Sequence, residues 1–197
     1  MGEKQVFQPL TREDKITTAV YRTGIVLSAV IIAALAFLAA TGSLVPGRTA
    51  DMLGFALYAS VGLSVFFIHL YIGRFKRFLM NLYFVSLAAL AALLFIGKGS
   101  VSAALIQTPL STLLLLPLSG CLGFVTAKEA FCFKLIEGYL LAMIMPLYLL
   151  LVAGGVLPGK SASYGLLVIS ALLVLFTLRK VIQPIAWDIG DKSAYQP

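Results

Sequence analysis

Four residues of the sequence have side chains of the types that bind metal ions: His69, Cys121, Cys132 and Glu137. Imidazole, thiolate and carboxylate groups are the ligands that zinc and similar metals take from proteins. The alternative is a structural role, with His69 as a hydrogen-bonding residue near the membrane surface and the cysteines as small core residues with free thiols. A haem held by two histidines is excluded within this chain, because the sequence contains a single histidine.

Lys134 and Glu137 form a second candidate interaction. Residues at positions i and i+3 share a helix face, so this ammonium group and this carboxylate could neutralise each other. An ionised carboxylate close to hydrocarbon needs such a partner. We therefore expect Glu137 to be held by Lys134, or by a hydroxyl or amide group of a neighbouring helix. We expect His69 to present its ring to a bound protein or tetrapyrrole.

The elements that position these residues are predicted to be membrane-spanning helices. Of the 197 residues, 60% are hydrophobic and 12% are charged, and the mean hydropathy is +1.01. Each of six stretches without Asp, Glu, Lys or Arg reaches the roughly 18 residues that a helix needs to cross about 30 Å of hydrocarbon. These stretches are residues 23–47, 52–73, 78–97, 99–127, 138–159 and 161–178. The sequence thus predicts an all-α polytopic membrane protein with six transmembrane helices.

The fourth stretch is the longest and contains Pro109 and Pro117. Proline interrupts a helix because it lacks an N–H group and its ring clashes with the preceding turn. We expect a short surface segment followed by a kinked span, and we place the start of the fifth helix at Phe131.

Three regions follow from these spans: an N-terminal tail (residues 1–22), a six-helix transmembrane domain (23–179) and a C-terminal tail (180–197). A cleaved signal peptide is disfavoured, because Glu3, Glu13 and Asp14 precede the first apolar stretch. That stretch is also longer than the roughly 7 to 15 apolar residues of a signal peptide.

The basic residues indicate the orientation of the chain. Twelve of the 15 lysine and arginine residues lie in the two tails or near the second and fourth connections between spans. The other three are Arg48, Lys98 and Lys160. The positive-inside rule then predicts three in-out-in hairpins with both termini cytoplasmic. The net charge of +7 is explained by topology and lipid contact, and no basic segment indicates binding to nucleic acid.

A short sequence occurs twice, as GSLVPGRTA at residues 42–50 and GGVLPGKSA at residues 154–162. Both copies fall in predicted outer turns, where Pro46–Gly47 and Pro158–Gly159 stop one helix and begin a tight turn. Duplication of one hairpin unit and the independent use of a common turn both explain the match. If the repeat is real, the two turns should share one backbone geometry.

Catalytic motifs are missing from the sequence. It has no Gly-rich phosphate loop and no G-x-S-x-G motif, and its four aspartates lie outside the predicted spans. We therefore expect a protein that is not an enzyme.

The segments AKEAFCFKLIEGYLLAMIMPLYLLL and FIHLYIGRFKR resemble an uncharacterised integral membrane protein family of cyanobacteria and chloroplasts. The resemblance covers most of the chain and is most specific at residues 128–133 and Glu137. It implies a thylakoid or plasma-membrane location and a role as an auxiliary or assembly factor beside photosynthetic membrane complexes. Photosystem subunits would then be partners, and chlorophyll or another tetrapyrrole a candidate pigment.

Two functions remain open at this point. One is a non-enzymatic protein that docks to larger membrane complexes through His69, and the other is a small-solute or ion transporter that uses the proline-containing helix and Glu137. The interior of the bundle distinguishes them: a transporter needs a polar cavity near the middle of the membrane, whereas a docking protein can be packed throughout.

Overall fold

The computed structural model describes residues 11–70 and 72–189, and this part of the chain contains helices and no strands. Its six spans are long and apolar enough to cross a membrane, as predicted: α1 (Arg12–Ala40), α2 (Arg48–Phe67), α3 (Gly73–Ile96), the 3₁₀ helix η1 (Pro109–Leu115) continuing into α5 (Leu116–Phe133), α6 (Ile136–Ala153) and α7 (Lys160–Val181). Two short helices, α4 (Val101–Gln107) and α8 (Ala186–Ile189), lie between or after these spans.

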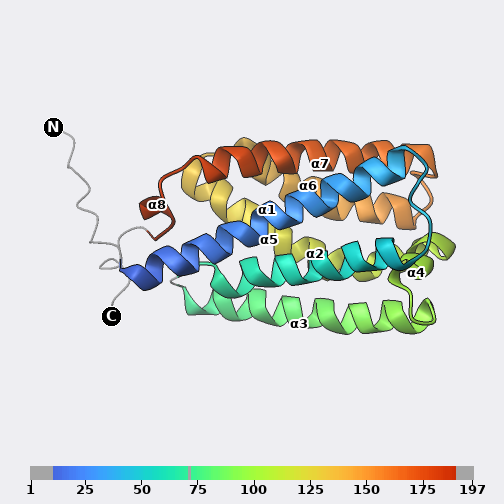
Figure 1. Ribbon diagram of the computed structural model, residues 1–197, viewed down its shortest axis with the longest axis horizontal. Coiled ribbons are helices and arrows are strands. Elements are labelled where there is room, and N and C mark those ends of the chain that lie inside the picture. Colours follow the sequence, from blue (N-terminus) through green and yellow to red (C-terminus); the bar gives the residue numbers. More distant parts are fainter. Residues whose placement is uncertain (1–10, 71, 190–197) are drawn as a thin grey trace.

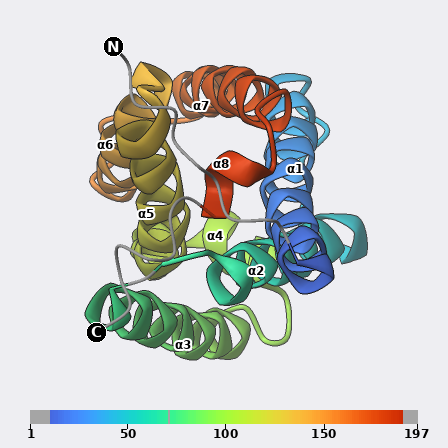
Figure 2. The ribbon, with the colours of Figure 1, turned by 90° about the vertical axis from the view of Figure 1, so that its left-hand side faces the viewer.

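The spanning helices form a ring (Figure 2). Around it the order is α1, α2, α3, α5, α6 and α7, and α7 packs back against α1. The short helices lie at opposite ends of the ring axis (Figures 1 and 2). One end of the ring, which we name the basal end, contains the start of α1, the α2–α3 and α5–α6 connections and residues 179–189. The end with the α1–α2, α3–α5 and α6–α7 connections is the turn end, where α4 lies.

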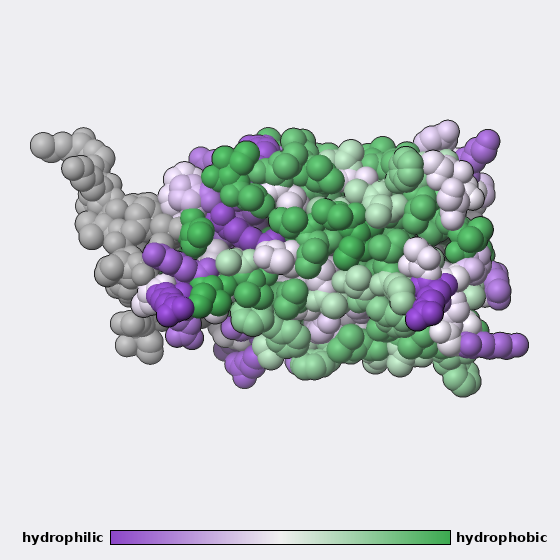
Figure 3. Space-filling model, in the orientation of Figure 1, coloured by the Kyte–Doolittle hydropathy of each residue, from purple (hydrophilic) through white to green (hydrophobic). Residues whose placement is uncertain are grey.

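The surface has the polarity that a membrane requires. Hydrophobic residues cover the middle of the visible face, and hydrophilic residues gather near its two ends (Figure 3). Charged groups are costly in hydrocarbon, so they collect where water and lipid headgroups are available. The position of the spans predicted from the sequence therefore agrees with the surface of the folded chain.

Small residues allow α1 and α2 to approach closely. A Cβ atom on Gly24 would lie 2.4 Å from Ser64 Oγ and 2.7 Å from the Ser60 carbonyl oxygen. One helical turn further, the hydroxyls of Ser28 and Ser60 are 2.8 Å apart. Small residues and hydroxyl hydrogen bonds commonly hold membrane helices together. This contact fixes two adjacent walls of the ring.

The prolines act as the sequence indicated. α4 is a separate short helix, and Pro109 opens η1, where a missing N–H group leaves no hydrogen bond unmade. Pro117 lies in the first turn of α5. The fourth span therefore starts with a 3₁₀ segment and becomes an α-helix.

The start of the fifth span was predicted wrongly. α5 continues to Phe133 and α6 begins at Ile136, so Phe131 and Cys132 belong to the end of the fourth span. Lys134 ends α5 in the left-handed conformation, with φ of 55°. The connection between these two spans is therefore a very short turn at the basal end.

The two repeated turns differ in backbone geometry. Arg48 and Lys160 occupy matched positions and both begin helices. The glycines before them do not match: Gly47 is extended, with φ of 164° and ψ of 177°, whereas Gly159 has φ of 48° and ψ of −117°. The shared turn geometry expected from the repeat is therefore wrong at this position.

Candidate functional site

The basal end contains charged side chains that are buried together. Lys180 of α7 forms ion pairs with Glu129 of α5 and with Asp188 of α8. The side chains of Lys180 and Glu129 are fully buried, and that of Asp188 is 1% exposed. An isolated ion in such a place costs several kcal/mol, so each of these groups depends on the others.

Two further cations and a phenol join this group. Arg22 Nε lies 2.8 Å from Asp188 Oδ2, and Lys128 Nζ lies 2.7 Å from Glu129 Oε1. The Tyr21 hydroxyl donates to the same Glu129 oxygen at 2.7 Å. We name these residues the basal cluster: Tyr21, Arg22, Lys128, Glu129, Lys180 and Asp188. The cluster joins α1, α5, α7 and α8.

The same contacts hold α8 in place. Arg22 Nη1 donates to the carbonyl oxygen of Gln183 at 2.7 Å, in the connection between α7 and α8. Trp187 stacks on Phe133, with ring centroids 6.2 Å apart and an interplanar angle of 12°. Lys180 Nζ lies 3.9 Å from the centre of the Phe133 ring. A four-residue helix has no stability of its own, so α8 depends on these contacts.

Asp188 is ionised in this environment. Burial by itself would raise the pKa of the Asp188 carboxyl, but the hydrogen bond from Arg22 and the charge of Lys180 outweigh burial. The pKa of Asp188 is therefore held below its usual range. Asp188 is thus a negative charge that ties α8 to two cations of other helices.

Glu137 has a different partner from the one predicted. Because Lys134 adopts a left-handed conformation outside both helices, the i and i+3 spacing does not place it on one helix face with Glu137. Arg179 of α7 instead brings Nη1 to 2.8 Å from both carboxylate oxygens of Glu137. The Glu137 side chain is 7% exposed and that of Arg179 is 50% exposed. The expected pair with Lys134, or with a hydroxyl or amide group, is therefore replaced by a guanidinium pair.

His69 lies in the α2–α3 connection and is half-buried. Its Nε2 lies 3.2 Å from the Thr17 hydroxyl of α1. Burial lowers the pKa of His69, and the charge of Lys128 acts in the same direction. Nδ1 is buried and has no hydrogen-bond partner among the described residues. The ring thus contacts its own chain, and its presentation to a bound protein or tetrapyrrole stays a prediction.

The proposed metal ligands are not brought together. Cys121 is buried in the hydrophobic core, whereas Cys132 is exposed at the end of α5. In the described part of the chain, no group of three or more His, Cys, Asp or Glu residues could hold a metal ion. His69 and Glu137 have the protein partners described above, so the structure offers no shared site for these four residues.

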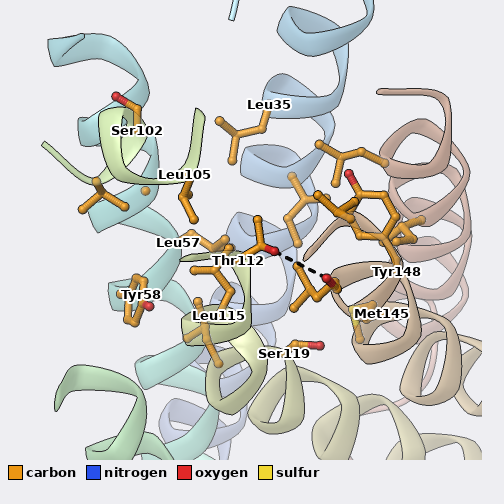
Figure 4. A pocket seen from close by; sticks show the side chains of 18 of the residues that line it. Leu35, Leu57, Tyr58, Ser102, Leu105, Thr112, Leu115, Ser119, Met145 and Tyr148 are labelled. Atoms are coloured by element: carbon orange, nitrogen blue, oxygen red, sulfur yellow. Dashed lines mark hydrogen bonds between the residues drawn. The ribbon is translucent and has the colours of Figure 1, made fainter. Parts of the chain in front are cut away.

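A cavity of about 260 Å³ lies inside the ring, in the half nearer the turn end. α1, α2, α4, η1, α5, α6 and α7 all contribute to its wall. Most of the wall is hydrophobic, with Leu35, Leu57, Leu105, Leu115 and Met145 among the side chains drawn in Figure 4. The cavity is partly open, and its apolar wall suits an apolar guest.

Five hydroxyl groups belong to residues of the cavity wall. Those of Ser102, Thr112 and Tyr148 have hydrogen-bond partners in the protein. The Tyr58 hydroxyl and Ser119 Oγ are buried and have none among the described residues. Tyr58 as a whole is 4% exposed. The cavity wall is therefore apolar, and these two hydroxyl oxygens are enclosed by protein.

Sequence reasoning missed both the basal cluster and the cavity. Two features of the sequence were available as signals for the basal cluster. Glu129 directly follows Lys128 at the end of a span, and Asp188 stands between Trp187 and an apolar residue. Neither signal names a partner, because the interacting residues lie up to 166 positions apart in the chain. The cavity has no sequence signal, since its wall comes from many separate segments.

The six spans, the apolar middle and the charged ends define an all-α polytopic integral membrane protein. Residues 63–196 match the family described as uncharacterized integral membrane protein (DUF2301). The match covers more than half of the chain, so the chain belongs to this family, as the resemblance indicated. No curated protein and no solved structure matches the chain.

Proposed function

We propose that this chain is a non-enzymatic membrane protein that binds and carries a small lipophilic molecule. The observation that supports this function is the cavity of about 260 Å³ inside the ring of spanning helices. Because its wall is hydrophobic, the transported molecule is lipophilic and not the small solute or ion of the hypothesis drawn from the sequence. A pathway for ions or strongly polar solutes would need polar walls to replace the lost hydration.

The ends of the ring support a carrier. α4 lies over the turn end, and the basal cluster ties α8 to α1, α5 and α7 at the other end. The cavity is partly open to the surface of the protein, so a ligand can enter and leave while both ends of the ring stay in place. The basal cluster would act as the closure of one end.

Docking to photosystem subunits, with chlorophyll or another tetrapyrrole at His69, is the other function predicted from the sequence and the family resemblance. His69 Nε2 contacts the Thr17 hydroxyl, and Nδ1, which has no hydrogen-bond partner among the described residues, is buried, so the position of the ring does not add support to this role. A thylakoid location and the cytoplasmic placement of the termini also stay predictions.

Naphthalene binding tests the proposed function. The wild-type protein in detergent should retain radiolabelled naphthalene in equilibrium dialysis above the level of empty micelles. Gly54 lines the cavity, and a Cβ atom there would meet only Val101, at 4.0 Å. Gly54→Phe should therefore fill the cavity without a backbone clash and abolish this retention.

The control adds the same side chain outside the cavity. Ala59 lies on the same helix and is exposed, so Ala59→Phe should retain naphthalene like the wild type. Absence of binding by the wild type, or equal binding by all three proteins, would overturn the proposed function.

A further inference from the structure

The cavity opens at the turn end of the ring, as the burial of its wall indicates. On the spanning helices, the lining residues furthest from this end are all buried: Ile32, Val61, Leu122, Met145 and Ile169. Nearer the turn end, Leu44, Val152 and Leu166 are half-buried, and Ile106 at the end of α4 is 46% exposed. The opening therefore lies among these four residues, and we name it the mouth.

α4 covers only part of the turn end. It packs against α2, α3 and η1, and among the described residues it has few contacts at most with α1, α6 and α7. Ala50 of α2 and Thr112 of η1 lie on the covered side and are buried. Figure 4 shows Leu105 of α4 and Tyr148 of α6 on opposite sides of the cavity. The mouth therefore lies between α4 and the ends of α1, α6 and α7, on the side away from α3.

The two repeated turns of the sequence, residues 42–50 and 154–162, lie beside each other at this end (Figure 1). Ser163, directly after the second turn, donates through Oγ to the carbonyl oxygen of Ala39, shortly before the first turn, at 3.1 Å. This hydrogen bond closes the gap between α1 and α7. The two turns thus border the mouth from the side that α4 leaves uncovered.

Each repeated turn contributes one cation, Arg48 or Lys160. Each of these residues stands in sequence between two residues of the cavity wall. Both are exposed, and neither side chain has an ion pair or hydrogen bond with the described part of the protein. The nearby carboxylate of Asp51 accepts instead from the Ser102 N–H group at 2.7 Å and from Ser100 Oγ at 3.2 Å. Two positive charges at the mouth are therefore free to bind an anion from outside the chain.

The wall and the mouth favour different parts of one ligand. No Asp, Glu, Lys, Arg or His belongs to the described lining of the cavity. A charged group inside would lose its hydration without gaining an opposite charge. At the mouth, the same group keeps its contact with water and is attracted by the two cations. An acidic group of the ligand is therefore favoured at the mouth, and an apolar body is favoured inside.

The volume sets the size of the apolar body. A cavity of roughly 150 Å³ holds benzene, which has six non-hydrogen atoms. The cavity of about 260 Å³ is larger than that and is enclosed on all sides except at the mouth. In proportion, it has room for about ten non-hydrogen atoms.

We propose that the ligand is a lipophilic acid. Its apolar body of about ten non-hydrogen atoms occupies the cavity, and a single carboxylate or phosphate head group lies at the mouth beside Arg48 and Lys160. This assignment rests on the proposed function, because it describes the occupant of the same cavity. It also gives the repeated turns a shared role, since each supplies one cation to the mouth.

Two probes of nearly equal shape test the charge of the head group: 2-naphthoate, which is an anion, and 2-naphthamide, which is neutral. Their affinities are measured by equilibrium dialysis at low ionic strength, in one nonionic detergent, for the wild type and for each variant. Dividing the affinity ratio of a variant by that of the wild type cancels the different partition of the probes into micelles. The preference for 2-naphthoate should fall about 2- to 5-fold in Arg48→Gln and in Lys160→Gln, the effect of one exposed charge, and further in the double variant.

Lys98→Gln is the matched control. Lys98 is exposed at the same end, but it follows α3, which contributes no residue to the described cavity wall. Its probe preference should equal that of the wild type. Gly54→Phe, which fills the cavity, should abolish retention of 2-naphthoate as well as of naphthalene. A third probe, 2-naphthyl phosphate, assigns the head group: wild-type retention above that of 2-naphthoate indicates a phosphate, and retention below it a carboxylate.

The outcomes separate this assignment from the proposed function. If naphthalene binds and the probe preference is unchanged in both Arg48→Gln and Lys160→Gln, the acidic head group is wrong and the carrier function stands. An equal loss of preference in Lys98→Gln, or full retention of 2-naphthoate by Gly54→Phe, would also overturn the assignment. If the wild type retains neither naphthalene nor 2-naphthoate, the proposed function itself fails.

Discussion

The basal cluster and the cavity lie in opposite halves of the same ring, and they treat buried polar groups in opposite ways. At the basal end, Glu129 and Lys180 are fully buried and each has a partner of opposite charge. In the cavity wall, the Tyr58 hydroxyl is equally buried and lacks a partner among the described residues. A buried polar group without a partner costs free energy, so the paired charges support the basal end, whereas the Tyr58 hydroxyl adds nothing to the stability of the cavity wall.

The two regions also differ in what they contact. The basal cluster draws together α1, α5, α7 and α8 by ion pairs whose strength depends on the exclusion of water. The cavity touches seven helical segments mainly through hydrophobic side chains. Substitutions at the basal end should therefore act on stability, and those in the cavity on binding.

The largest effect is expected for Glu129→Gln. This change leaves the buried Lys180 with Asp188 alone and removes the charge that Lys128 contacts, so it should lower the free energy of unfolding by about 3–5 kcal/mol. Glu137→Gln is the matched variant, because its partner Arg179 is half exposed and can turn to water. That variant should lose only about 1 kcal/mol.

Thermal unfolding in one detergent at one scan rate, followed by circular dichroism, compares these two variants. Equal losses for Glu129→Gln and Glu137→Gln would contradict the view that the basal cluster is the more strongly coupled group.

A smaller effect is expected when Asp188 is protonated. Its pKa is lowered in the folded protein, so its contribution to stability is complete above the unfolded value of about 3.9 and is lost as the pH falls through the lower folded value. Trp187 is the single tryptophan of the chain and stacks on Phe133, so its fluorescence reports the position of α8. The emission should stay constant from neutral pH to about pH 4 and change below it.

Asp188→Asn should show the acid-type emission already at neutral pH. His69→Gln serves as the control, because His69 also titrates in acid, and it should leave the transition unchanged. A midpoint above the ordinary pKa of an aspartate would show that Asp188 does not hold α8.

The smallest effect is expected for Tyr58→Phe in the ligand-free protein. Because the Tyr58 hydroxyl has no partner among the described residues, its removal should leave the unfolding temperature equal to or slightly above that of the wild type. Tyr148→Phe should cost about 1 kcal/mol, since it removes the hydrogen bond to the Ala162 carbonyl oxygen. A clear loss of stability in Tyr58→Phe would show that its hydroxyl has a partner in the folded protein.

The six spans and the family could be predicted from the sequence because each depends on local information. A run of about 18 apolar residues satisfies the requirement for crossing a membrane wherever its neighbours lie. Pro109 and Pro117 likewise marked the irregular start of the fourth span through their own covalent geometry. The prediction for Lys134 and Glu137 was wrong because it assumed one continuous helix across a residue that ends α5.

The candidate sites were decided by the tertiary structure. Arg22 and Asp188 are 166 positions apart, and only the closure of the ring by α7 against α1 brings them within 2.8 Å. In the same way, the cavity is the space that remains between helices whose individual sequences are simply hydrophobic. Hydrophobicity selects the membrane without selecting partners, so the pairing of buried charges and the position of the empty volume are fixed only when the helices pack together.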